Sequence, residues 1–210
     1  MAKTQIVYVE RKRSESGQTG TVTYDLPESG VIPEIIVRVY STPTASTNPA
    51  LPLTDAITKI EIVDGATVIQ SLTGNQVKAL SMFRGEKEMA MTSTDDNAAE
   101  GYEDFRLILG GKFNGTSIAP DFSKFTNPQI KISWDYSDTT TEFGMTCDAD
   151  ASPALKITVM CKVVREGGRY KHGYVKTSQI KTFTQAVSTE NRIDIPRGEP
   201  LLGIMIEAGY

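Results

Sequence analysis

The sequence predicts an all-β protein, an antiparallel eight-stranded jelly roll (β-sandwich) followed by the opening strands of a second jelly roll. Apolar and polar residues alternate with a period of two along much of the chain, and helical periodicity is rare. Clusters of Gly, Pro, Asn and Asp separate the alternating runs, as turns between antiparallel strands require. Long, uneven loops favour a two-sheet jelly roll over an up-and-down barrel, whose hairpins are short.

Eight runs in the first 166 residues are predicted to be strands. They lie at residues 18–26, 33–40, 57–63, 66–71, 86–92, 103–109, 129–137 and 154–165. Asp64-Gly65 separates the third run from the fourth and predicts a hairpin with a type I′ turn, because both of its central residues need positive φ. Thr73 is the expected cap of a helix with Val77, Leu80 and Phe83 on one face, ended by Gly85.

The C-terminal part is expected to begin a second unit. Three more β-prone runs follow a linker, at residues 180–187, 191–196 and 201–206. Asp194-Ile195-Pro196 before the last run loosely repeats Asp25-Leu26-Pro27 before the run at 33–40. The expected division is an N-terminal arm at 1–17, a first jelly roll at 18–166, a linker at 167–181 and the start of a second jelly roll at 182–210.

Composition excludes several classes of protein. Lys and Arg number 22 against 26 Asp and Glu, a net charge of −4, which does not fit a sequence-specific nucleic-acid binder. Cys147 and Cys161 are too few for a disulfide framework. The chain has neither the ~20 apolar residues of a transmembrane helix nor a signal peptide over Met1–Gly20, so synthesis in a cytoplasm is expected.

The residues do not assemble into a recognisable catalytic motif, and we expect no enzyme activity, metal or cofactor. His172 is the single histidine and has no nucleophile or orienting carboxylate beside it in sequence. Gly110-Gly111 and Gly167-Gly168 are predicted turns rather than phosphate cradles. Acidic pairs that do not match a calcium loop are read as solvated, although glycosidase geometry stays open because it depends on separation in space. They are Asp95-Asp96, Glu100 with Glu103-Asp104, Asp135 with Asp138, and Asp148 with Asp150.

Two other features have alternative readings. Lys3, Arg11, Lys12 and Arg13 make the first 17 residues basic, and they are candidate contacts to an inner surface, a genome or anionic lipid, or simply part of a solvated turn. Trp134 shares its strand face with Ile130 and Ile132, which favours a core position over stacking on a sugar.

The layout resembles the major capsid proteins of tailless icosahedral double jelly-roll viruses, many of which enclose a membrane. The strand, hairpin and helix at 60–65 and 69–74 are similar to part of that family's first roll. Segments 107–111 and 125–132 are similar to the pattern around its last strands, and 193–198 to the entry of the second roll. Family members have two complete rolls, so we expect this chain to be part of a longer polypeptide or to be completed by a neighbour.

The resemblance implies a structural virion protein made in the host cytoplasm. Its partners would be itself, as homotrimers that form pseudo-hexagonal capsomers, neighbouring capsomers or other capsid proteins, and an internal lipid membrane, with the N-terminal residues toward the inner side. The alternative is a carbohydrate-binding or receptor-binding β-sandwich, because jelly rolls also serve as lectins. That reading needs exposed aromatic residues such as Tyr102, Trp134 or Tyr136 grouped on one face.

Overall fold

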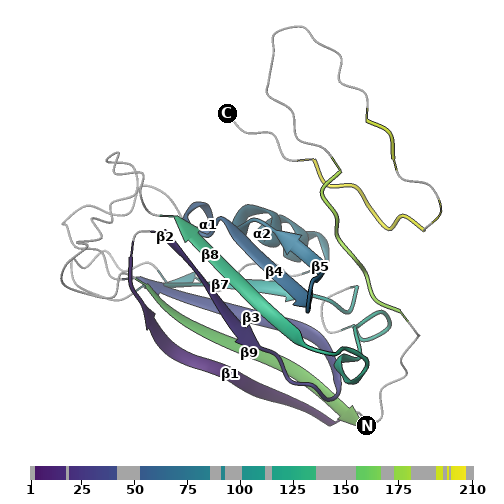
Figure 1. Cartoon of the computed structure of the whole chain (residues 1–210), viewed down its shortest axis with the longest axis horizontal. Helices are drawn as coiled ribbons and strands as arrows, with labels where there is room; N and C mark the ends of the chain where they lie inside the picture. Colours follow the sequence, from purple (N-terminus) through teal and green to yellow (C-terminus); the bar gives the residue numbers. More distant parts are fainter. Residues whose placement is uncertain are drawn as a thin grey trace, which may run out of the picture.

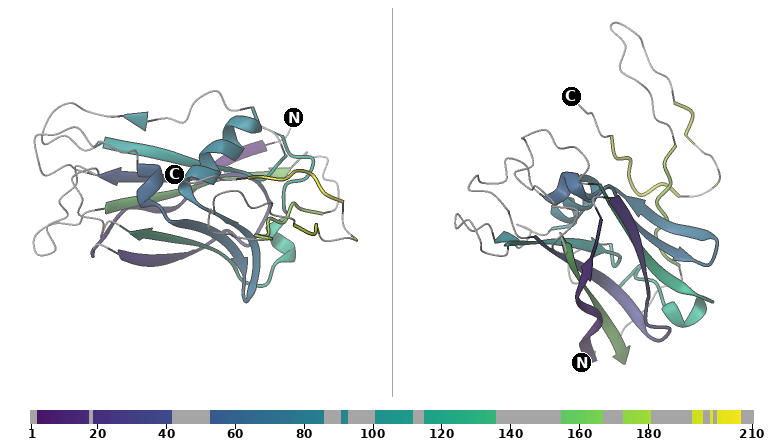
Figure 2. Two further views of the ribbon diagram at one scale, coloured as in Figure 1. Left: turned by 90° about the horizontal axis from the view of Figure 1, so that it is seen from above. Right: turned by 60° about the vertical axis from the view of Figure 1, so that its left-hand side comes forward.

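The structure is a computed structural model in which two antiparallel sheets pack face to face (Figures 1 and 2). It describes residues 3–17, 19–41, 53–85, 91–92, 101–111, 115–135, 155–166, 173–180, 193–195, 198 and 200–206. The strands are β1 (Lys3–Glu15), β2 (Thr19–Asp25), β3 (Val31–Ser41), β4 (Lys59–Asp64), β5 (Thr67–Leu72), β6 (Met91–Thr92), β7 (Gly101–Ile108), β8 (Pro128–Asp135) and β9 (Leu155–Glu166). The helices are α1 (Leu53–Ala56), α2 (Gly74–Phe83) and the short 3-10 helix η1 (Phe122–Lys124).

The order of the strands confirms the predicted jelly roll. One sheet runs β1-β9-β3-β7-β6 and the other β2-β8-β4-β5. Consecutive strands alternate between the two sheets except for the pairs β4–β5 and β6–β7. This winding brings β1 and β9, which are distant in sequence, side by side along one edge of the molecule (Figure 1). An up-and-down barrel would instead pair neighbours in sequence.

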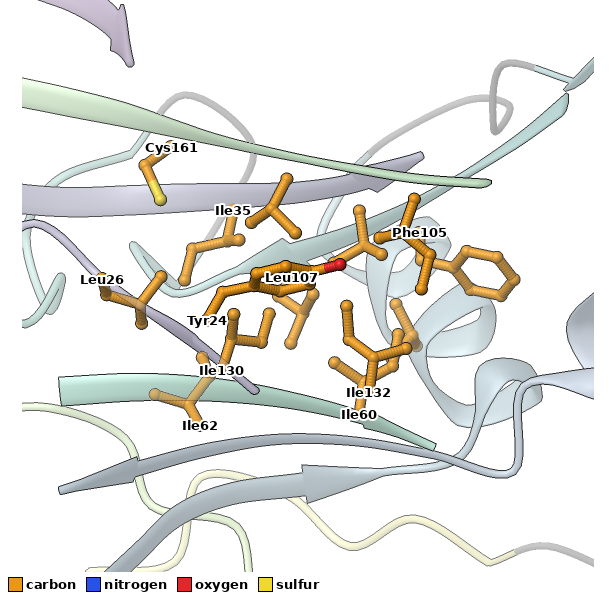
Figure 3. Packing of buried hydrophobic residues seen from close by; sticks show 14 of the residues in the cluster. Tyr24, Leu26, Ile35, Ile60, Ile62, Phe105, Leu107, Ile130, Ile132 and Cys161 are labelled. Carbon is orange, nitrogen blue, oxygen red and sulfur yellow. The ribbon is translucent and has the colours of Figure 1, made fainter. Parts of the chain in front are cut away.

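The core lies between the two sheets. Alternation within β8 is complete, so Ile130, Ile132 and Trp134 point inward while Lys131 and Ser133 do not. Isoleucine side chains from β4 and β8 meet Ile35, Phe105 and Leu107 from the other sheet (Figure 3). These β-branched and aromatic residues fit a pleated, half-buried surface, and their burial is the main source of stability. Phe122, which is fully buried, anchors the loop before β8 onto this core.

The β4–β5 hairpin is confirmed, but its turn differs from the prediction. Gly65 has φ 56°, whereas neither Asp64 nor Ala66 has positive φ. Asp64 pairs with Thr67, so Gly65 is the first of two central residues, the arrangement of a type II′ turn. The Asp64 carboxylate is used elsewhere, because its Oδ1 accepts hydrogen bonds from the backbone N–H groups of Thr126 and Asn127 at 2.9 and 2.7 Å.

Helix α2 begins at the predicted cap. Thr73 and Gln76 form a reciprocal capping box. The predicted apolar face is wrong at its end, because Phe83 is 86% exposed while Gly74, Val77 and Ser81 are the buried positions. Gly74 is required there, since a Cβ would lie 2.2 Å from the carbonyl oxygen of Thr54.

The described residues form eight full-length strands, but the set differs from the prediction. Lys3–Glu15, which the sequence analysis set apart as an arm, forms β1 and pairs with β9 over most of its length. The run expected at 86–92 contributes only β6, Met91–Thr92, among the described residues. The edge of the sheet beside β9 is therefore occupied by the chain's own N-terminal segment, which removes an unpaired strand edge there.

The segment after β9 is only partly described. Gly173–Ile180 has no regular secondary structure, and neither has Leu201–Ile206, where a strand was expected. The five side chains between residues 201 and 206 are all exposed, and these residues pair with no strand among the described ranges. The expected runs at 180–187 and 191–196 fall mostly outside the described residues. The division of the chain into domains stays a prediction.

Candidate functional site

The most structured polar surface is the side of the five-stranded sheet that faces away from the core, here called the outer face. Strand register sets its side chains in rows across β1, β9, β3 and β7. The rows are Ile6–Lys162–Glu34–Ile108, Tyr8–Met160–Ile36–Arg106, Lys12–Thr158–Arg38–Asp104 and Ser14–Lys156–Tyr40–Tyr102. An apolar strip thus lies beside rows of cations and carboxylates.

The charged groups of the outer face lie in two layers, with buried carboxylates beneath more exposed cations. Arg38 donates two hydrogen bonds to Asp104, at 2.6 and 2.8 Å, and Arg106 Nη1 lies 3.3 Å from Glu34 Oε1. The carboxylates are almost inaccessible, with side chains 1% exposed for Asp104 and 7% for Glu34, whereas Arg38 is 29% exposed. The Asp104 carboxylate raises the pKa of Arg38 above its ordinary value, mainly through these hydrogen bonds. The accessible layer of the pairs is cationic.

Aromatic rings support several of the cations. Arg11 lies 4.1 Å from the ring centroid of Tyr8, and Lys12 lies 4.4 Å from that of Tyr40. Arg38 lies 4.2 Å from the centroid of Tyr102. A cation over an aromatic face gains about 0.5–1 kcal/mol at exposed sites. The rings therefore restrict where these positive charges sit.

An irregularity in β1 orients its basic residues. The β1–β9 register shifts between Tyr8 and Glu10 and again between Glu10 and Arg13. Lys12 takes φ 45° within this bulge and donates its backbone N–H to Thr158 Oγ1 at 2.9 Å. Bulges commonly redirect side chains in this way. The consequence is that Arg11 and Lys12 lie over tyrosine rings instead of alternating between the two sides of the strand.

The four predicted contact residues do not form one cluster. Arg11 and Lys12 belong to the outer face. Arg13 turns toward Glu15, with Nε 3.1 Å from Oε1, and toward the ring of Tyr24 on β2. Lys3 lies at the far end of β1, opposite Glu166. Tyr24 donates its hydroxyl to the same Glu15 carboxylate, and burial together with that carboxylate raises the pKa of Tyr24.

The inner side of the same sheet contains one buried charge, Glu103 on β7. Its side chain is 1% exposed, and Lys78 Nζ from α2 lies 3.5 Å from its Oε1, a weak hydrogen-bond distance. Burial raises the pKa of Glu103, an effect that the Lys78 ammonium opposes. No sequence pattern distinguished this carboxylate from the neighbouring Asp104, which faces the other way.

A segment from the C-terminal part contacts the edge of the four-stranded sheet. Thr177 donates its backbone N–H to the carbonyl of Ile69, and the N–H of Ser71 donates to Thr177 Oγ1, both at 3.0 Å. The ring of Tyr174 packs against that of Phe125 in a tilted arrangement, with centroids 5.4 Å apart. Figure 1 shows this green segment passing β5. It occupies hydrogen-bonding groups of an edge strand that would otherwise be open.

The other predicted residues are placed as follows. Trp134 is 4% exposed and part of the core, so it does not form a sugar-stacking surface, and Tyr102 is half-buried under Arg38. Cys161 is a buried free thiol whose pKa burial raises to about 12. Cys147, His172, Tyr136 and the acidic residues Asp95, Asp96, Glu100, Asp138, Asp148 and Asp150 lie outside the described residues.

Two features are absent from the described part of the chain. Within it, no group of three or more His, Cys, Asp or Glu side chains is arranged to hold a metal ion. Of the helices in those same ranges, none is long and apolar enough to cross a membrane.

The sequence analysis did not predict the contacts of the outer face. Arg38 and Asp104 are 66 positions apart, and Lys12 and Thr158 are 146 apart, so no local spacing reveals either contact. The signal that was available is the run Ile6-Val7-Tyr8-Val9, which is as β-prone as any predicted strand. Recognising it as a strand would have placed the basic residues on a sheet edge.

Comparison with solved structures identifies the same fold in viral capsids. A chain of the PBCV-1 virus capsid aligns with a TM-score of 0.55 and 12% identity over 79% of this chain and 42% of its own length. A chain from the atomic structure of Sulfolobus Turreted Icosahedral Virus gives 0.55 and 10%, over 78% and 46%. The major capsid protein of that virus, in a crystal structure, gives 0.52 and 13%, over 78% and 48%.

These similarities confirm, at the level of fold, the resemblance expected from the sequence. The chain spans less than half the length of each of these structures. No protein-family model matches the sequence, and no curated protein does.

Proposed function

We propose that this chain is a structural protein of an icosahedral virus capsid, which associates with copies of itself into trimeric capsomers and has no catalytic role. The observation that carries the proposal is the jelly roll itself, with sheets β1-β9-β3-β7-β6 and β2-β8-β4-β5, a fold shared with chains from two different virus capsids. Fold alone does not imply function, so the surface supplies the second argument.

The surface chemistry suits a protein that works through interfaces. The outer face presents Tyr and Arg side chains, the residue types enriched in protein interfaces, beside an apolar strip in which Ile6 is 58% and Tyr8 47% exposed. Leu201–Ile206 is a further exposed apolar segment. Both features expose apolar side chains that association would remove from water.

The predicted contact residues fit this proposal in part. Arg11 and Lys12 are exposed at the sheet edge, and we propose that they contact a neighbouring capsomer, an inner surface or a lipid headgroup. Arg13 is held by Glu15. Its side chain is nevertheless 52% exposed, so we retain Lys3, Arg11, Lys12 and Arg13 as proposed contacts.

The test is the state of association of the purified 210-residue chain. Light scattering and negative-stain electron microscopy should show trimers or larger ordered particles at micromolar concentration. A chain that stays strictly monomeric up to millimolar concentration contradicts the capsid proposal. Glycan-specific binding by such a monomer would support the carbohydrate-binding alternative instead.

A further inference from the structure

We propose that helices α1 and α2 act as a latch on strand β7, which opens locally when the buried carboxyl group of Glu103 loses its proton. This conformational device does not depend on the proposed capsid function, because it follows from the packing of one end of the sandwich. It starts from Glu103, whose side chain lies on the inner side of the five-stranded sheet and is almost completely buried.

The two helices form one unit that is tied to the four-stranded sheet. Asn75 Nδ2 in α2 donates a hydrogen bond to Asp55 Oδ1 in α1 at 2.5 Å. The backbone N–H of Gly74 donates to the carbonyl of Ile57, just after α1, at 3.0 Å. Two residues join α1 to β4, and Thr73 alone joins β5 to α2 (Figure 1). These short connections hold both helices at the ends of β4 and β5, so any local opening separates them from β7.

The contact between this unit and β7 is close at one position and poorly satisfied at another. The ring of Phe105 lies 3.1 Å from the point that a Cβ on Gly74 would occupy, so the helix packs tightly there. At Glu103, by contrast, both carboxylate oxygens are buried without a hydrogen-bond partner among the described residues. Lys78 Nζ lies 3.5 Å away, at the limit of hydrogen bonding, and the Thr54 hydroxyl of α1 is also buried and unpaired. Buried polar groups without partners cost free energy, so the latch is weakest at Glu103.

The groups that face Glu103 favour its protonated form while the latch is closed. Among the described residues, α2 supplies the Lys78 ammonium and α1 the Asp55 carboxylate. The register partners on β3 and β6, Val39 and Met91, carry no charge. Burial raises the pKa of Glu103, the Lys78 ammonium opposes this effect, and the Asp55 carboxylate adds to it. The closed latch therefore holds the proton more tightly than an open latch, in which the carboxyl group faces water.

This difference couples the loss of the proton to opening. The stability that the proton gives to the closed form is complete below the ordinary pKa of a glutamate and is lost as the pH rises through the raised pKa of Glu103. Between these two pKa values, the ratio of open to closed molecules grows by up to about tenfold for each pH unit. Opening would bring water to Phe105 while the strands of both sheets stay paired.

Native-state hydrogen exchange of the complete chain distinguishes local opening from global unfolding. Exchange is followed amide by amide by NMR from about pH 4.5 to about pH 7.5, at several urea concentrations below the unfolding transition. Each rate is converted to a protection factor, which removes the intrinsic pH dependence of exchange. The amides of α2 are compared with those of Ile130 and Ile132 on β8, in the core of the other sheet.

The latch predicts that α2 amides have lower protection factors than β8 amides, and that urea hardly alters them, because local opening exposes little surface. The protection factors of α2 should fall with rising pH by up to about tenfold per pH unit. Glu103→Gln should abolish this fall, since an amide side chain does not titrate. The matched control, Glu28→Gln, removes a charge from an exposed turn and should leave the fall unchanged. Lys78→Met removes the ammonium that opposes the raised pKa of Glu103, so the fall should continue to higher pH than in the wild type.

Three results would overturn the latch, and none of them bears on the capsid proposal. Equal protection and equal urea dependence of α2 and β8 amides would mean that the helices open only when the whole jelly roll unfolds. Protection of α2 that stays constant with pH, or a fall that persists in Glu103→Gln, would mean that Glu103 does not control the opening. A fall that Lys78→Met does not extend would mean that the ammonium does not act on this carboxyl group.

Discussion

The two sides of the five-stranded sheet are built from the same strands, yet they hold the fold together by different means. On the inner side, Val37, Phe105 and Val159 pack against the other sheet with no polar partner. On the outer side, the adjacent residue of each strand, Arg38, Asp104 and Thr158, forms a polar row. Burial of apolar area stabilises the first side without directional requirements. The polar contacts of the outer side depend on strand register and on geometry. They therefore determine which strands pair, and contribute less to how strongly the strands pack.

The largest expected effect comes from the inner side. Phe105→Ala removes a fully buried ring of the core cluster, which lies 3.1 Å from the position of a Cβ on Gly74 in α2. We expect a loss of about 3–5 kcal/mol in the free energy of unfolding, from lost transfer energy and the cavity left behind. Urea denaturation measures it. A loss below about 1 kcal/mol would mean that the Phe105 ring is not buried in the core.

Substitutions on the outer side should lower the free energy of unfolding less. The effect of replacing Arg38 should depend on whether Asp104 is replaced as well. Arg38→Ala leaves the Asp104 carboxylate buried without its bidentate donor, and we expect a loss of about 2 kcal/mol, since Arg38 itself is partly exposed. Arg38→Met combined with Asp104→Leu should recover most of that loss, because apolar residues of similar size can replace a buried ion pair. If the double variant is no more stable than Arg38→Ala, the loss does not come from leaving the Asp104 carboxylate unpaired, and it must come from contacts with neighbouring residues.

The contrast between the two sides also explains what the sequence could predict. Alternation reveals an apolar face, so β8, with Ile130, Ile132 and Trp134, was predicted with its correct inward residues. The partner of Arg38 follows only from the antiparallel register of β3 and β7, which alternation does not fix. Phe83 has the helical spacing of a buried residue, but it is the last residue of α2 and lies beyond the core, so its side chain is exposed.

Strand β1 shows the same limit from another direction. Its apolar run at Ile6–Val9 is short, and it is followed by Glu10-Arg11-Lys12-Arg13, which does not alternate. The bulge makes this sequence compatible with a strand, because it absorbs the residues that break the period. Bulges are properties of a strand pair, so a single strand read alone does not predict them.

Glu103 is the exception on the inner side and gives a pH-dependent prediction. Because burial raises its pKa above the ordinary value, the stability associated with its protonated form is present at low pH and is lost as the pH rises through the raised pKa. Glu103→Gln should therefore be more stable than wild type at pH 7.5, by roughly 1 kcal/mol, and nearly equal to it at pH 4. Urea denaturation at both values tests this.

The control for Glu103 is Glu28→Gln, which removes the same charge from an exposed turn. It should change stability by less than about 0.5 kcal/mol at either pH. If Glu103→Gln is instead destabilising at pH 7.5, the Lys78–Glu103 ion pair outweighs the cost of burying the carboxylate, and the inner side contains a functional salt bridge after all.

The smallest expected effect concerns the bulge that sets the outer face. Lys12 is the one non-glycine residue with positive φ among the described residues, at 45°. In a regular strand, glycine is less stable than alanine by about 0.5–1 kcal/mol, but at positive φ the order reverses because a Cβ is strained there. Lys12→Gly should therefore be more stable than Lys12→Ala by about 1 kcal/mol.

At Lys156, on the regular strand β9, the same pair of substitutions should give the opposite order. Chemical denaturation of the four variants measures these stabilities. The same order of stability at both positions would mean that β1 passes Thr158 without a bulge. The bulge would then not be the reason that Arg11 and Lys12 lie over the tyrosine rings.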